Sequence, residues 1–199
     1  MKSLILTGCV LLSLSVYSQR NRAPKMAPLY ADGYYVNQRN DTIRGKVQTN
    51  PSNKIAFYSQ FSFLKPPTKR AKLLNAKRTK AYGFDNRHFV TVEYRGEKLF
   101  LERLVSGRLQ FFEYRFDGKI YGYEAVESSY FIKDTYAEGE DSDLQELKKL
   151  SNMFYKKSLK PYMKDQKDIW DNLDKFNFDE ETVMKSIIEF NKNYIKSAN

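Results

Sequence analysis

Cysteine and histidine are nearly absent from this chain. Its 199 residues include one cysteine, Cys9, and one histidine, His88. Zinc sites are built from several cysteine or histidine ligands, so the composition excludes one. Cys9 lies in a segment that we expect to be removed. The mature chain would then have no disulfide, no thiolate nucleophile and no thiolate metal ligand.

Glycine-rich loops and calcium loops are also missing. The nine glycines are scattered singly through turns, which excludes a phosphate-binding glycine loop. Four acidic residues lie close together between Glu138 and Asp143, but their spacing is not that of an EF-hand. The composition therefore points to no metal and no cofactor.

A long hydrophobic run occurs only at the start of the chain. Lys2 followed by an apolar stretch to Val16 is typical of a signal peptide over residues 1–18, which would leave Gln19 as the first mature residue. Leu6-Thr7-Gly8-Cys9 resembles a lipobox, but the apolar run continues beyond it, which argues against lipidation. No later stretch is long enough to span a bilayer. We expect an exported protein that is periplasmic, outer-membrane-associated or secreted.

Positive charge is concentrated in the first half of the chain. The formal net charge is +10, and hydrophobic and aromatic contents of 41% and 15% are sufficient for a folded core. From Arg20 to Arg95 there are 16 basic and 4 acidic residues, and from Gly96 onward there are 17 basic and 20 acidic residues. The first half therefore offers a basic field to phosphate groups, carboxylate polymers or acidic lipid head groups.

An antiparallel meander from His88 to Phe116 is the centre of the predicted fold. Its three apolar, aromatic-rich segments are separated by turn signals at Arg95-Gly96-Glu97 and Ser106-Gly107-Arg108. The second and third segments carry large apolar groups on both faces, as in a sheet that is covered on both sides. We expect the C-terminal helices to cover the second face.

Further strands are predicted on both sides of the meander. A flexible basic arm at residues 19–29 precedes an antiparallel β domain at residues 30–136. Asn40 lies in the first hairpin turn, where asparagine tolerates left-handed backbone. The last two predicted strands meet at Glu127-Ser128. The predicted strands cover residues 32–37, 42–48, 54–58, 119–126 and 129–133.

The chain is predicted to become helical after an acidic linker at residues 137–143. Helical spacing predicts a helix from Leu144 that Pro161 ends or kinks, a short helix at 167–173 containing Trp170, and a last helix capped by Asp179. Residues 144–199 would pack on the sheet as a helical tail. The predicted class is α+β: an antiparallel twisted sheet, or a partly closed β-roll or barrel, followed by about three C-terminal helices.

The most distinctive local composition lies between residues 65 and 80. This segment contains seven basic side chains and no acid, and Pro66-Pro67 excludes a helix at its start. It is either a solvated loop or a site that clamps anionic groups, with Phe61, Phe63 and Tyr82 as stacking faces. The candidate ligand-binding residues are Lys65, Lys69, Arg70, Lys72, Lys77, Arg78, Lys80 and Tyr82.

Catalytic candidates are few. Asp85 precedes His88 at a spacing that would let it orient the imidazole, but no serine is implied as a nucleophile, so a turn or packing role is the simpler interpretation. Glu102 and Glu113 could meet across adjacent strands and act as the paired carboxylates of a glycosidase, although the sequence leaves their separation open. No catalytic residue is assigned.

Five stretches of the chain carry a resemblance to a known family. They are Gly33–Val36, Asn40–Val47, Ala81–Phe84, Phe100–Gly107 and Phe190-Asn191. Together they resemble uncharacterised exported proteins of Bacteroidota, which open with a signal peptide and a GYY-x-N…GDTIKGK hairpin and end in a helical tail with an aromatic-Asn motif. Asn40 stands where the family's turn usually has glycine. The resemblance implies export and no established activity, so it assigns no functional residue.

These patterns predict an exported, non-catalytic cell-envelope protein that acts as a binding or assembly module for a macromolecular partner. The alternative is a salt-sensitive binder of an anionic lipid or polysaccharide through residues 65–80, and the third possibility is an envelope polysaccharide hydrolase. The expected partner is an envelope protein or an anionic envelope polymer or lipid. Nucleic acid is not expected, because export removes the chain from it.

Overall fold

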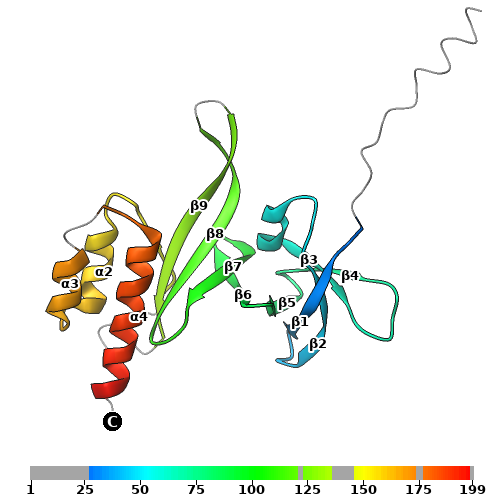
Figure 1. The fold of residues 1–199 in the computed structure, drawn as a ribbon, viewed down its shortest axis with the longest axis horizontal. Coiled ribbons are helices and arrows are strands. Elements are labelled where there is room, and N and C mark those ends of the chain that lie inside the picture. The colour runs from blue at the N-terminus through cyan, green and yellow to red at the C-terminus, as the bar shows by residue number, and fades with distance from the viewer. Residues whose placement is uncertain (1–26, 121–122, 136–145, 174–176, 198–199) are drawn as a thin grey trace, which may run out of the picture.

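Antiparallel strands followed by three helices form the described part of the protein (Figure 1). The computed structural model describes residues 27–120, 123–135, 146–173 and 177–197. In these residues ten strands form one sheet in the order β10-β9-β8-β7-β6-β5-β1-β2-β3-β4. The predicted α+β class is confirmed, and the sheet is not closed. The elements are β1 (Tyr30–Asn37), β2 (Thr42–Gln48), the 3-10 helix η1 (Lys54–Tyr58), β3 (Gln60–Leu64), β4 (Lys72–Asn75), β5 (Thr79–Phe84), β6 (Arg87–Tyr94), β7 (Glu97–Val105), β8 (Leu109–Ile120), β9 (Tyr123–Asp134), β10 (Lys148–Leu150), α2 (Tyr155–Met163), α3 (Lys167–Leu173) and α4 (Glu180–Ser197).

The first hairpin and the central meander have the predicted positions. β1 pairs with β2 across a turn in which Asn40 has a positive φ of 67°, a conformation that asparagine adopts more readily than most residues. β6, β7 and β8 are antiparallel neighbours. Their turns contain Gly96 with a φ of 80° and Gly107 with a φ of 137°. Local turn residues therefore set these hairpins.

The strand predicted at Lys54–Tyr58 is wrong, because these residues form the 3-10 helix η1. The Asn53 side chain accepts a hydrogen bond from the Ile55 amide and so caps the first turn. Phe57 and Tyr58 are both buried in the core. A strand would send two successive side chains to opposite faces, whereas the helix delivers both to the same face of the sheet.

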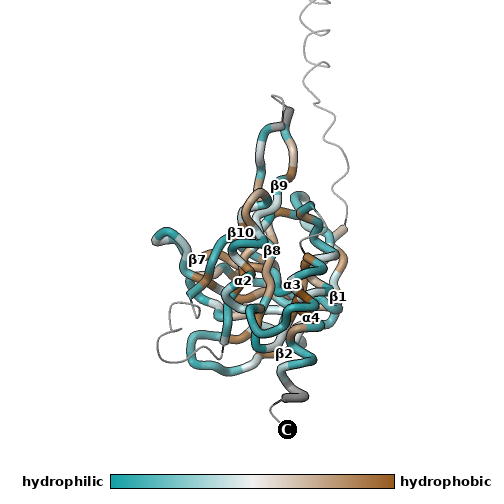
Figure 2. Tube along the Cα trace, turned by 90° about the vertical axis from the view of Figure 1, so that its left-hand side faces the viewer, coloured by the Kyte–Doolittle hydropathy of each residue, from teal (hydrophilic) through white to brown (hydrophobic). Residues whose placement is uncertain are grey.

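The connection predicted at Glu127-Ser128 is also wrong. β9 continues through these residues, with Glu127 paired to Phe116 and Ser128 paired to Arg115 on β8. The β8–β9 hairpin consequently extends beyond the rest of the sheet in both views (Figures 1 and 2). Pairing with a long partner strand outweighs the local preference of polar residues for a turn.

The helix predicted from Leu144 is partly wrong. The acidic linker and the start of that helix lie outside the described residues. Lys148–Leu150 is not helical but forms β10, where the buried Leu150 pairs with Tyr130. α2 begins only at Tyr155, and Pro161 lies inside it, shortly before its end. α3 and α4 have the predicted positions, and the Asp179 carboxylate accepts a hydrogen bond from the Thr182 amide as the predicted cap of α4.

One face of the sheet carries two hydrophobic clusters. Directly paired residues share a face. On this face α2, α3 and α4 pack near β8 and β9, and η1 and β3 pack near β5 and β6. A row of paired residues crosses eight strands on this face: Leu150, Tyr130, Glu113, Glu102, Phe89, Tyr82, Tyr35 and Ile43.

The opposite face carries a smaller cluster of Leu101, Phe112 and Phe131. The described helices do not pack there, but on the face that carries Phe89 and Glu102. They share the first face with η1 because Phe111 and Ile132 of β8 and β9 point to the same side as Glu113. None of the described helices is long and apolar enough to cross a membrane.

Candidate functional site

Two acidic side chains meet in the middle of the row that crosses the sheet. Glu102 on β7 and Glu113 on β8 are directly paired, which confirms that they meet across adjacent strands. Their neighbours in the row are Phe89 and Tyr130, which belong to the two different hydrophobic clusters. Glu102 is 8% exposed and Glu113 is 1% exposed. Carboxylates this buried require polar partners.

Tyr58 of η1 lies between the two carboxylates. Its hydroxyl oxygen is 3.0 Å from Glu102 Oε2 and 3.3 Å from Glu113 Oε2. A phenol has one proton to donate, so it serves one carboxylate at a time. Burial, and then the charges of Glu102 and Glu113, raise the pKa of Tyr58 far above its ordinary value. The hydroxyl therefore acts as a donor and not as a base.

Two arginines neutralise the pair. Arg87 donates from Nε and Nη2 to the two oxygens of Glu102 at 2.7 and 2.6 Å. Glu113 accepts from Arg115 Nε at 2.8 Å and from Ser128 Oγ at 2.7 Å. Burial acts to lower the pKa of Arg87, but its hydrogen bonds and ion pair with Glu102 outweigh this effect and raise it. We call this group the carboxylate cluster: Tyr58, Arg87, Glu102, Glu113, Arg115 and Ser128.

The geometry of the carboxylate cluster favours a structural role over catalysis. A glycosidase needs carboxyl groups that reach the substrate, whereas both of these are enclosed and each is held by an arginine. The Arg87 guanidinium also lies over the rings of Phe57 and Phe89, 5.1 and 4.9 Å from their centroids, which adds cation–π contacts to the ion pair. The cluster therefore joins η1 to four strands of the sheet, β6 to β9.

The seven basic side chains between residues 65 and 80 are all exposed. In the described part of the chain none of them forms an ion pair. β4 separates them into two groups, so they do not converge on one point. The loop group, at the start of β4, is Lys65, Lys69, Arg70 and Lys72, and the turn group, beyond its end, is Lys77, Arg78 and Lys80.

The predicted stacking residues belong to the core. Tyr82 is fully buried between Phe61 and Phe89, with ring centroids 3.9 and 4.5 Å away. Its hydroxyl donates to the carbonyl oxygen of Phe57. Phe61 and Phe63 are each 3% exposed. The assignment of Tyr82 to a ligand-binding surface is therefore corrected, because β3 folds over β5 and covers the ring.

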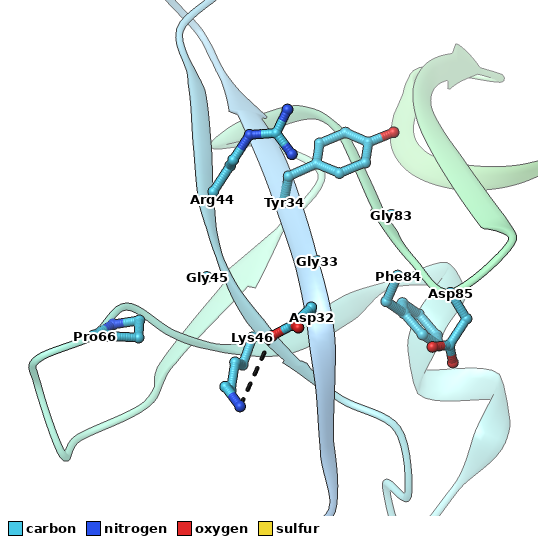
Figure 3. A pocket seen from close by; sticks show the side chains of 10 residues that line it. All are labelled: Asp32, Gly33, Tyr34, Arg44, Gly45, Lys46, Pro66, Gly83, Phe84 and Asp85. Atoms are coloured by element: carbon cyan, nitrogen blue, oxygen red, sulfur yellow. Dashed lines mark ion pairs between the residues drawn. The ribbon is translucent and has the colours of Figure 1, made fainter.

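A concavity of about 570 Å³ lies next to the loop group (Figure 3). β1, β2 and β5 form it, and Pro66, which follows Lys65, contributes to its wall. Tyr34 of β1 is paired with Arg44 of β2, and both line the concavity. These two residues were not among the sequence candidates. The alternation of side chains along the predicted hairpin could have placed them on one face.

His88 contacts Tyr34 and not the predicted partner Asp85. The Tyr34 hydroxyl is hydrogen-bonded to His88 Nδ1, and the two rings are 5.9 Å apart between centroids. Asp85 instead occupies the turn between β5 and β6 with a φ of 49°. Burial, and then the positive charge of Arg103, lower the pKa of His88 to about 4. The imidazole is therefore neutral at neutral pH while it shares this hydrogen bond with Tyr34.

The lowered pKa of His88 predicts that the folded protein loses stability in weak acid. The unfolded chain takes up the His88 proton near the ordinary pKa of 6.5, and the folded chain takes it up only near pH 4. The stabilising contribution is full above pH 6.5 and is lost as the pH falls toward 4. We expect it to be about 1–2 kcal/mol, after allowance for the partial exposure of the ring.

Urea unfolding at pH 7 and pH 4.5 measures this effect. The free energy of unfolding should fall more in the wild type than in His88→Gln, whose amide can accept the Tyr34 hydrogen bond but does not titrate. Equal losses in the two proteins would show that His88 does not carry the pH dependence.

In the described residues, no group of three or more histidine, cysteine or acidic side chains is arranged to hold a metal ion. The two features that remain as functional candidates are the loop group and the concavity beside it. A comparison with known proteins found no matching family, no similar curated protein and no similar solved structure.

Proposed function

We propose that the protein is an exported, non-catalytic component of the cell envelope that binds an anionic macromolecule through the basic residues around β4. The observation that carries this proposal is the exposure of seven basic side chains without an ion pair in the described residues. Elsewhere the structure pairs its buried charges, as Arg87 and Arg108 do with Glu102 and Asp134. Cations left unpaired at the surface are available to a partner.

The anionic partner is an envelope lipid or polysaccharide in this proposal. Export, a prediction of the sequence, keeps the protein away from nucleic acid. A hydrolase is less well supported, because Glu102 and Glu113 are enclosed in the carboxylate cluster. A protein partner is the second candidate, supported by the exposed Leu73 of β4, which is 63% exposed between basic residues.

Neutralising the loop group is expected to weaken binding and to reduce its salt dependence. The triple variant Lys69→Gln, Arg70→Gln and Lys72→Gln removes three of its charges, each of which would release a counterion on binding. We expect affinity for a polyuronate or for anionic vesicles to fall by about tenfold or more. Titration calorimetry at low and high salt measures both quantities on the chain from Gln19.

A charge-matched control separates local binding from net charge. Lys157→Gln, Lys164→Gln and Lys167→Gln remove three exposed charges from the helical end of the molecule, so the net charge falls equally while the loop group is untouched. Binding that is insensitive to salt, or that falls equally in both triple variants, contradicts the proposal. Salt-insensitive capture of one envelope protein would favour the second candidate.

A further inference from the structure

The concavity beside the loop group has a flat aromatic side chain on one side. A Cβ added to Gly83 would lie 3.0 Å from both Cε1 and the hydroxyl of Tyr34. The same Cβ would lie 2.8 Å from the carbonyl oxygen of Arg87, so the Tyr34 ring lies across Gly83 where the backbone leaves no room for a side chain. The hydrogen bond to His88 on β6 fixes the far end of the ring. One side of Tyr34 is thus supported by backbone.

Tyr34 nevertheless remains partly exposed. It lines the concavity together with Gly83 (Figure 3), so part of the ring is accessible from the concavity. An aromatic ring that is held in place loses little conformational entropy when a ligand stacks on it. Tyr34 is therefore a preorganised stacking surface.

Charged side chains surround this ring. Arg44 is the cross-strand partner of Tyr34, and Lys46 and Asp32 form a second cross-strand pair whose charged atoms are 3.8 Å apart. Asp85 lines the concavity opposite them (Figure 3). A guanidinium binds carboxylate or phosphate oxygens in bidentate fashion, and exposed carboxylates accept hydrogen bonds from hydroxyl groups. The site thus combines groups suited to an anion, to hydroxyls and to a flat apolar surface.

We propose that this concavity binds one acidic sugar unit of a polysaccharide. The apolar face of the sugar ring would stack on Tyr34, its carboxylate or phosphate would pair with Arg44, and its hydroxyls would donate to Asp32 or Asp85. Neighbouring units would pass over Pro66 to the loop group. A volume of about 570 Å³ falls within the range of about 300–1,000 Å³ of small-ligand sites. This inference rests on the proposed function and specifies the class of ligand.

The test uses the chain from Gln19 with an oligogalacturonate, a neutral oligosaccharide of equal length and anionic vesicles as probes. Tyr34→Leu removes the ring and should weaken oligogalacturonate binding by about tenfold, the scale of one lost aromatic stacking contact. Tyr34→Phe keeps the ring but loses the hydrogen bond to His88, so it should weaken binding less than Tyr34→Leu does. The neutral oligosaccharide should bind more weakly than the oligogalacturonate in every case.

A measurement on the wild type does not depend on the folding of any variant. The ring proton resonances of Tyr34 should shift on addition of oligogalacturonate, because a stacked ligand changes their surroundings. Unshifted Tyr34 resonances at saturation would overturn the sugar site. So would an affinity that Tyr34→Leu leaves unchanged while the loop-group variant loses binding, and in that case the proposed function stands. Binding of vesicles but of neither saccharide would also overturn the site. Absence of binding to every anionic probe would refute the site and the proposed function together.

Discussion

Glu102→Ala is expected to lower the free energy of unfolding by about 3 kcal/mol, because it leaves a guanidinium in the core without its partner. Arg87 donates two short hydrogen bonds to this carboxylate, and its guanidinium packs over the rings of Phe57 and Phe89. Its side chain is 34% exposed, which places the expected loss at the lower end for a buried ion pair. Urea denaturation at neutral pH measures the change.

A second variant distinguishes a lost ion pair from lost packing. The double substitution Arg87→Met and Glu102→Leu replaces the pair by apolar side chains of similar volume and should recover most of the stability. Tyr58 keeps Glu113 as an acceptor in this protein. A loss below about 1 kcal/mol for Glu102→Ala alone would show that the carboxylate cluster is not a main stabilising contact.

Asn191→Ala is expected to destabilise the protein by about 2–3 kcal/mol, because it removes the polar contact between α4 and the β7–β8 turn. The Asn191 amide accepts from the Leu109 amide at 2.9 Å and donates to the carbonyl oxygens of Leu109 at 2.9 Å and Ser106 at 3.3 Å. Leu109 is fully buried. Without Asn191, a buried backbone N–H has no partner, and water cannot replace it freely.

Asn193→Ala is the matched control, since this side chain is exposed and bonds only to the side chain of Gln166 in the described residues. It should change the free energy of unfolding by less than about 0.5 kcal/mol. Thermal or urea unfolding of both variants, followed by the fluorescence of Trp170 in α3, would report on the helices. Equal effects of the two substitutions would contradict the proposed role of Asn191.

Short-range signals in the sequence predicted the elements that depend on short-range contacts. Asn40, Gly96 and Gly107 mark the turns of the hairpins, and all three adopt positive φ. The cap at Asp179 and the apolar stripe of α4 also have local causes. These features could be predicted because each depends on residues close together in the chain.

Two of the errors concern residues whose structure is decided by distant partners. Lys148–Leu150 has helical spacing with its neighbours but pairs with β9, where Leu150 contacts the helical core. Tyr82 lies close in sequence to the basic segment and was therefore predicted to be a surface stacking residue. In the structure Phe61 of β3 covers its ring. Such pairings are determined by packing of the whole sheet, and the secondary-structure propensities of neighbouring residues do not encode this packing.

The candidate site was partly predictable for the same reason. The pairing of adjacent strands is enough to bring Glu102 and Glu113 together. Tyr58 of η1, whose hydroxyl lies between the two carboxylates, is 44 residues from Glu102 and 55 from Glu113 in the chain. The basic side chains were expected at the surface because charge runs are usually solvated. The stacking surface of Tyr34 was missed because it depends on Gly83 of β5. This strand pairs with β1 but is distant from it in the sequence.

Gly83 and Asn191 lie in stretches on which the family resemblance was predicted, and both have structural roles. Gly83 leaves room for the Tyr34 ring, and Asn191 binds the β7–β8 turn, where a Cβ at Gly107 would lie 2.5 Å from the Asn191 amide nitrogen. Residues of this kind are required by backbone geometry. The family resemblance and the export that it implies both stay predictions.

The position of β4 at the margin of an open sheet gives its basic residues a second effect. β4 pairs with β3 on one side only, so its other side presents backbone donors and acceptors that could pair with the same strand of another molecule. Lysines along a short outer strand oppose such contact by charge repulsion between copies and by the cost of removing them from water. Lys72 beside the exposed Leu73 is placed to do this. We therefore expect Lys72 to oppose self-association through this edge of the sheet, whatever ligand the loop group binds.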